Sequence, residues 1–115
     1  MELTYYHNPK CSKSRSGLEM LENRNIHFTI KEYLKEPLSI EEVLSLFAKL
    51  GLPILDALRK KEPLFIDHHL EEMNWSHERW AKFIVENPIV LERPILVNQT
   101  HAVIGRPTQN LESLL

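Results

Sequence analysis

Cysteine is almost absent from this sequence, which has a single one, Cys11, among 115 residues. One cysteine cannot form an internal disulfide, so we expect a reducing compartment such as the cytoplasm. Lysine plus arginine (14) do not outnumber the acidic residues (16), and the net charge of −2 argues against nucleic acid as a partner. No apolar run approaches the ~20 residues that span a bilayer, and the N-terminus has no signal-peptide pattern. We therefore expect a cytoplasmic protein without membrane or nucleic-acid partners.

What the sequence does contain is the pattern of one α/β domain, residues 1–115. Residues 2–7 and 26–33 are rich in β-forming side chains, and both segments predict strands. Between them, residues 12–25 have apolar side chains at helical spacing. Strand, helix, strand predicts a βαβ unit, whose two strands are parallel.

The middle of the chain predicts a helical insert, at about residues 39–87. Ser39 and Glu42 have the spacing of a capping box, in which each side chain bonds the free backbone N–H of the other residue. Residues 54–61, ILDALRKK, predict a short helix, and Ser76 is placed to cap a further one.

The last quarter returns to short strands. PILVN (94–98) and THAVIG (100–105) predict an antiparallel hairpin, and RPTQNLESLL (106–115) predicts a closing helix with Pro107 in its first turn. The expected fold is therefore α/β: a βαβ unit plus a ββα unit that share a mixed sheet, with the helical insert between them.

Cys11 lies in the segment HNPKCSKSR (7–15), after a predicted strand and at the start of a predicted helix. Free N–H groups at a helix start, and nearby lysine or arginine, stabilise a thiolate. A small buried apolar residue is the competing interpretation, which this context disfavours. Ser14 stands at the fourth place of a Cys-x-x-Cys pattern, so an external thiol must resolve any covalent intermediate on Cys11. The phosphatase loop Cys-x₅-Arg needs arginine where Gly17 stands, so phosphatase chemistry is not favoured.

Three arginines adjoin apolar segments: Arg59, Arg93 and Arg106. Arg93 and Arg106 flank the predicted hairpin, so the fold can bring their guanidinium groups together. A planar guanidinium suits a tetrahedral oxyanion better than the point charge of lysine does. The alternative for each is an ordinary solvated arginine.

Four segments, taken in order, resemble the glutaredoxin-coupled arsenate reductase family, which has a thioredoxin-like fold: HNPKCSKSR, ALRKK, NPIVLERPILV and IGRP. The resemblance covers essentially the whole chain. It implies that Cys11 is the nucleophile and that arginines bind arsenate and then arsenite, namely Arg59, Arg93 and Arg106. It further implies that a cis-proline, Pro94, lies beside the cysteine and that the loop supporting the thiolate includes His7, Asn8, Ser14 and Arg15.

The resemblance also implies how the reaction proceeds. The Cys11 thiolate attacks arsenate, glutathione reduces the adduct as co-substrate, and glutaredoxin takes up the mixed disulfide. We expect no tightly bound cofactor. We expect no metal site either, because the adjacent His68 and His69 project in different directions and no second cysteine completes a ligand set.

Two other functions are compatible with the same fold. Spx-like regulators bind RNA polymerase, although they typically have cysteine where Ser14 stands here. A thiol transferase acting on another substrate is the second alternative. The reductase is favoured because all three arginines are present.

Overall fold

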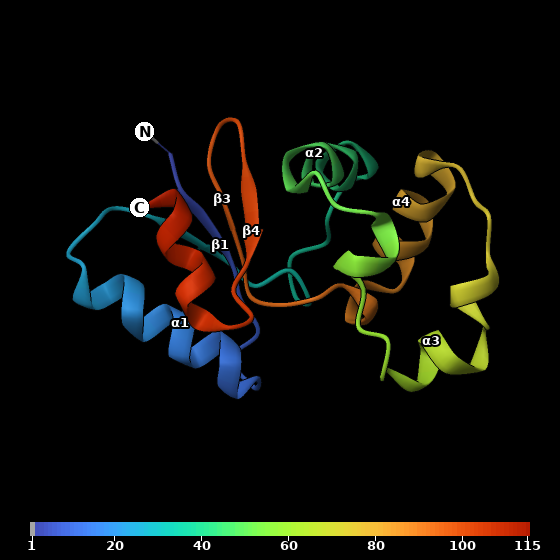
Figure 1. The fold of residues 1–115 in the computed structure, drawn as a ribbon, viewed down its shortest axis with the longest axis horizontal. Coiled ribbons are helices and arrows are strands. Elements are labelled where there is room, and N and C mark those ends of the chain that lie inside the picture. The colour runs from blue at the N-terminus through green and yellow to red at the C-terminus, as the bar shows by residue number, and fades with distance from the viewer. Residues whose placement is uncertain (1) are drawn as a thin grey trace. The chain divides into compact units, whose positions relative to one another are not determined.

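The computed structural model describes residues 2–115, which form two compact units (Figure 1). The first unit ends at Glu36 and resumes as Arg93–Leu115, and the second unit is Pro37–Glu92. Within residues 2–115, no helix combines the length and the apolar character that crossing a membrane requires.

The first unit contains a four-stranded mixed sheet in the order β2-β1-β3-β4. Its strands are β1 (Thr4–Tyr6), β2 (Thr29–Lys31), β3 (Ile95–Val97) and β4 (Ala102–Ile104). β1 pairs in parallel with β2 and antiparallel with β3, and β3 pairs antiparallel with β4. The predicted α/β class, the parallel βαβ pair and the antiparallel hairpin are confirmed.

The elements of the first unit are shorter than predicted. Only three residues of each strand pair with a neighbour, rather than the longer segments 2–7 and 26–33. Helix α1 (Ser12–Asn23) ends before the predicted residue 25. Asn25 has a φ of 55°, a left-handed conformation that asparagine tolerates but that no α-helix continues through.

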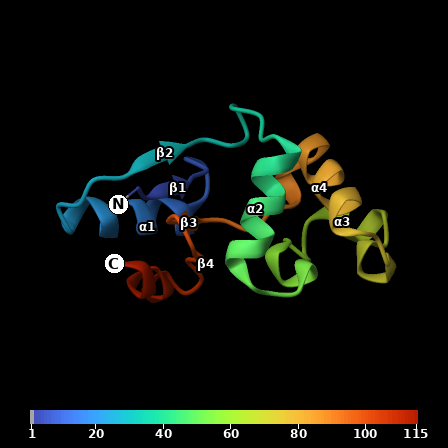
Figure 2. The ribbon, with the colours of Figure 1, turned by 90° about the horizontal axis from the view of Figure 1, so that it is seen from above.

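The core of the first unit lies on one face of the sheet. Tyr5 and Leu96 are opposite each other in β1 and β3, and Leu21 of α1 and Leu111 of η4 (Thr108–Leu114) pack on them. All four side chains are fully buried. Both ribbon views show α1 and the C-terminal η4 side by side (Figures 1 and 2). The closing helix is a 3₁₀-helix that starts after Pro107, rather than the predicted helix with this proline in its first turn.

The second unit is helical. It contains α2 (Ile40–Leu50), η1 (Ile54–Ala57), α3 (Pro63–Asp67), η2 (Leu70–Glu72), α4 (His77–Glu86) and η3 (Pro88–Val90). The two longest helices, α2 and α4, pack against each other (Figure 2). Ser39 and Glu42 form the predicted capping box, and the Ser76 hydroxyl caps α4 as predicted.

The predicted helix over residues 54–61 is wrong beyond Ala57. Leu58 is extended (φ −114°, ψ 152°) and forms an isolated antiparallel bridge with Leu91. The backbone N–H of Arg59 donates to the Val90 carbonyl at 2.7 Å. These backbone bonds to a distant segment replace the helical ones, so Arg59 follows a bridge and is not on a helix.

Candidate active site

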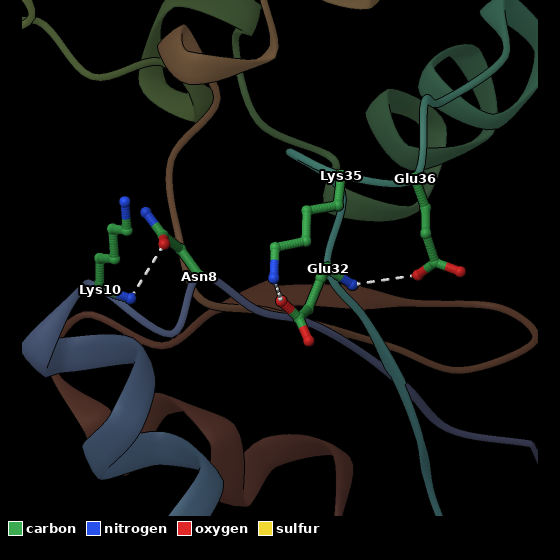
Figure 3. A network of polar contacts seen from close by, with 5 residues as sticks. All are labelled: Asn8, Lys10, Glu32, Lys35 and Glu36. Atoms are coloured by element: carbon green, nitrogen blue, oxygen red, sulfur yellow. Dashed lines mark hydrogen bonds and ion pairs between the residues drawn. The ribbon is translucent and has the colours of Figure 1, made fainter.

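A tight turn brings the chain from β1 to the start of α1. The Asn8 side-chain oxygen accepts the Lys10 backbone N–H at 3.0 Å (Figure 3), and the Asn8 carbonyl accepts the Cys11 N–H, also at 3.0 Å. The Arg15 guanidinium donates to the Pro9 carbonyl across the same turn at 2.8 Å. Cys11 is thereby held at the N-cap of α1, where the first N–H groups of a helix have no helical acceptor.

The Cys11 thiol is half-buried and has a pKa below its ordinary value. Burial alone raises this pKa, because a thiolate loses solvation. The backbone N–H of Ser14, the Arg93 guanidinium and the backbone N–H of Lys13 lower it and outweigh burial. The thiolate form is therefore favoured by the start of the helix and by one buried cation.

Two of the three predicted arginines lie at the thiol. The Arg106 Nη2 is 3.5 Å from the Cys11 sulfur, and the Arg106 Nε donates to the Arg93 carbonyl at 2.7 Å. The Arg93 side chain is buried, with only 7% of the residue exposed, and its guanidinium lowers the pKa of the Cys11 thiol. The Arg93–Pro94 bond is cis, as predicted, and so is the Arg106–Pro107 bond.

His7, Asn8 and Ser14 form a buried polar cluster behind the thiol. The Ser14 hydroxyl accepts the Asn8 backbone N–H at 3.0 Å and lies 2.6 Å from the His7 Nδ1. Burial lowers the pKa of His7, against the opposing charge of Glu32, so its neutral form is favoured. A neutral His7 protonated at Nε2 accepts the Ser14 hydroxyl proton at Nδ1, and this fixes the first turn of α1.

Glu32 lies in a small group of charges that follows β2. Its carboxylate is 3.5 Å from the Lys35 ammonium, and its backbone N–H donates to the Glu36 carboxylate at 3.3 Å (Figure 3). Glu32 is the main group that raises the pKa of His7. Burial still lowers the pKa of His7 by more than the Glu32 carboxylate raises it.

Arg59, the third predicted arginine, belongs to the second unit. Its Nη1 lies 2.5 Å from the Glu62 carboxylate, and its side chain is 27% exposed. The first unit therefore brings together Cys11, the polar cluster and two arginines, while Arg59 is held by its own unit. Of the other predicted residues, Pro94 is buried and Arg15 is exposed.

Two residues beside the site were not predicted from the sequence. The Tyr5 hydroxyl donates to the Ser14 carbonyl at 2.6 Å, and Gly17 leaves the space that this hydroxyl occupies. A glycine inside a helix is unfavourable relative to alanine, which was the one available signal of a close neighbour. No local pattern could identify that neighbour as a strand residue.

This arrangement can bind an oxyanion and attack it. The guanidinium groups of Arg93 and Arg106 and the helix N–H groups meet at the thiol, and Arg93 and the N–H groups lower its pKa. Among residues 2–115, no group of three or more histidine, cysteine or acidic side chains is arranged to hold a metal ion. The thiol can supply a nucleophile, and the two arginines supply positive charge.

Comparison with known proteins finds the same family that the motifs resemble. The model described as the ArsC family matches residues 6–114. The arsenate reductase of Haemophilus influenzae is 37% identical, with all of both chains covered. That of Neisseria meningitidis serogroup A is 36% identical, over 99% of this chain and 98% of its own. The solved arsenate reductase from Vibrio cholerae is 37% identical, with a TM-score of 0.93, over 100% of this chain and 98% of its own.

Proposed function

Because the chain belongs to the ArsC family, we propose that it reduces arsenate to arsenite through the thiolate of Cys11. The observation that carries this proposal is the meeting of a thiol whose pKa is lowered with Arg93 and Arg106 at the start of a helix. A thiolate nucleophile and a cationic oxyanion site are the two requirements for attack on arsenate. Similarity to proteins named arsenate reductase supports the choice of oxyanion.

The first step is nucleophilic attack. The Cys11 sulfur forms a bond to arsenic(V), and one arsenic–oxygen bond breaks. The departing hydroxide takes a proton and leaves as water. Arg93 and Arg106 neutralise the oxygens that remain on arsenic, and the buried Arg93 does so in a region where charge is poorly screened.

The electrons come from two thiols. A glutathione thiolate attacks the Cys11 sulfur, the sulfur–arsenic pair of electrons passes to arsenic, and arsenic(III) leaves as arsenite. The product on the protein is a Cys11–glutathione mixed disulfide, which a glutaredoxin dithiol reduces. The chain supports this external route because it has one cysteine and carries Ser14 where a resolving cysteine would stand. Such a relay belongs in a reducing compartment, and we place the protein in the cytoplasm.

The test is arsenate-dependent NADPH oxidation in a system of glutathione, glutaredoxin and glutathione reductase. We expect turnover by the wild type, none by Cys11→Ser, and none when glutaredoxin is omitted. Activity retained in Cys11→Ser would remove the central claim. Absence of wild-type activity together with a stable complex with RNA polymerase would favour the regulator instead.

A further inference from the structure

The hydroxyl of Tyr5 connects the sheet to the first turn of α1. Tyr5 is the middle residue of β1 and is fully buried. Its hydroxyl donates to the Ser14 carbonyl at 2.6 Å. Ser14 is also the residue whose backbone N–H stabilises the Cys11 thiolate. One residue of the strand thus holds the residue that supports the nucleophile.

Gly17 makes this approach possible. A Cβ atom at position 17 would lie 2.2 Å from the Tyr5 hydroxyl oxygen, which is far inside contact distance. Gly17 does not have a positive φ, so the backbone does not require glycine there. Since glycine destabilises a helix interior relative to alanine, space for Tyr5 is the reason that the structure offers for it.

The phenol can only act as a donor while it is protonated. Burial raises the pKa of Tyr5 well above its ordinary value, and the negative charge of Cys11 adds to this effect. The hydroxyl therefore keeps its proton across the pH range in which the thiol ionises. The Ser14 hydroxyl is held from the other side by His7 and Asn8, so residue 14 is fixed at both its carbonyl and its side chain.

We propose that Tyr5 is a positioning residue for the Cys11 thiolate: its hydroxyl, seated in the space left by Gly17, fixes Ser14 in the first turn of α1, at whose N-cap Cys11 lies. The inference rests on the proposed function in that it adds a residue to the same site. Tyr5 does not touch the reacting atoms and acts through Ser14.

The direct test is the pH dependence of Cys11 alkylation by iodoacetamide in Tyr5→Phe, which removes only the hydroxyl. At the pH where the wild-type thiol is half ionised, we expect the rate to fall roughly twofold to sevenfold, the range that one ordinary hydrogen bond produces. At a pH where both thiols are fully ionised, the rates should agree. An unchanged pH profile in Tyr5→Phe would overturn the proposal.

The matched control is Tyr6→Phe, which removes the same group from the next residue of β1. Successive strand residues face opposite sides of a sheet, so Tyr6 points away from α1. We expect the alkylation profile of Tyr6→Phe to match the wild type. An equal change in both variants would mean a general effect of losing a buried hydroxyl and would also overturn the proposal.

A second pair of variants tests whether Tyr5 occupies the space at Gly17. Gly17→Ala should lower the thermal midpoint, because its Cβ displaces the Tyr5 hydroxyl. The double variant Tyr5→Phe/Gly17→Ala should regain part of that loss and keep the lower thiol reactivity. An equal loss of thermal midpoint with and without the hydroxyl would show that Tyr5 does not fill this space.

Alkylation reports on the thiol without arsenate, so the two proposals can fail separately. A wild type with no arsenate turnover, whose alkylation nevertheless depends on Tyr5, would reject the reductase and retain the positioning role. A fully active reductase whose alkylation profile is unchanged in Tyr5→Phe would retain the reductase and reject the positioning role.

Discussion

At the scale of single residues, the pKa of the Cys11 thiol depends on whether burial or the neighbouring polar groups have the greater effect. Burial by itself would make this thiol less acidic, as for a cysteine in an apolar core. The N–H groups of Ser14 and Lys13 and the charge of Arg93 reverse that effect. A side chain that is commonly a small core residue therefore has a thiolate form that these three groups favour.

Arginine at position 106 is expected to be irreplaceable by lysine. Its Nε bonds the Arg93 carbonyl while its Nη2 reaches the Cys11 sulfur, and a single ammonium cannot make both contacts. Loss of one charge-assisted hydrogen bond, ~1.5–3 kcal/mol, lowers kcat/KM for arsenate by roughly tenfold to a hundredfold in Arg106→Lys. The measurement is steady-state kinetics in the glutaredoxin-coupled assay.

The control for this substitution is Arg79→Lys. Arg79 is exposed in the second unit and lies over the Trp75 ring, 4.7 Å from its centre. We expect arsenate kinetics at wild-type level in this variant. Equal kinetics in Arg106→Lys and Arg79→Lys would contradict the assignment of Arg106 to the oxyanion site.

At the scale of elements, the site depends on how closely the hairpin and η4 approach each other. Gly105 follows β4, and its N–H donates to the Pro94 carbonyl at 2.9 Å. A Cβ atom at Gly105 would lie 2.9 Å from both Pro94 and Leu111. Gly105 is thus packed between the start of β3 and η4. This packing fixes the backbone position of the next residue, Arg106.

Gly105→Ala is expected to lower the free energy of unfolding by about 1–3 kcal/mol, because the methyl group overpacks this junction. It should also weaken arsenate use by shifting Arg106. Gly51→Ala is the control: Gly51 has a φ of 63° and no neighbour near its Cβ position, so alanine costs about 1 kcal/mol through its backbone alone. Urea unfolding and the coupled assay measure both effects. Normal stability in Gly105→Ala would contradict the packing argument.

At the scale of the whole molecule, the predicted site residues are divided between two units. The chain leaves the first unit at Glu36 and returns to it at Arg93, the buried arginine of the site. The groups that make the thiol acidic, Ser14, Lys13 and Arg93, all belong to the first unit. Arg59 belongs to the second and is paired there with Glu62. A substitution at Arg59 therefore leaves unchanged every group that lowers the pKa of the thiol.

Arg59→Ala is expected to reduce kcat/KM for arsenate by at least tenfold, since the family resemblance implies that this charge binds the oxyanion. The pH profile of Cys11 alkylation should stay at wild-type values, because none of the groups that set it is changed. Both quantities can be measured on the same preparation. A shifted alkylation profile in Arg59→Ala would show that the units are coupled at the thiol, and unchanged kinetics would remove Arg59 from the site.

The sequence was sufficient for features that depend on neighbours in the chain. Helical spacing, the Ser39 capping box and the position of Cys11 at a helix start follow from contacts within about four residues, and the structure contains all three. The strands were predicted at the correct places in the chain, but the predicted segments were too long. Their ends depend on which residues find a partner in another strand, and that is set by pairing across the sheet.

Only the tertiary structure decided which distant residues meet. Arg106 reaches a sulfur that lies 95 residues away in the chain, and Leu58 bridges Leu91 where a helix was predicted. Tyr5 fits the space at Gly17 because strand register and helix packing align them, which no periodic pattern records. The sequence by itself determined most of the elements and the place of Cys11 at a helix start, since both follow from local spacing. The geometry around the thiol was decided by packing, because it depends on side chains that approach one another only after the sheet and its helices have assembled.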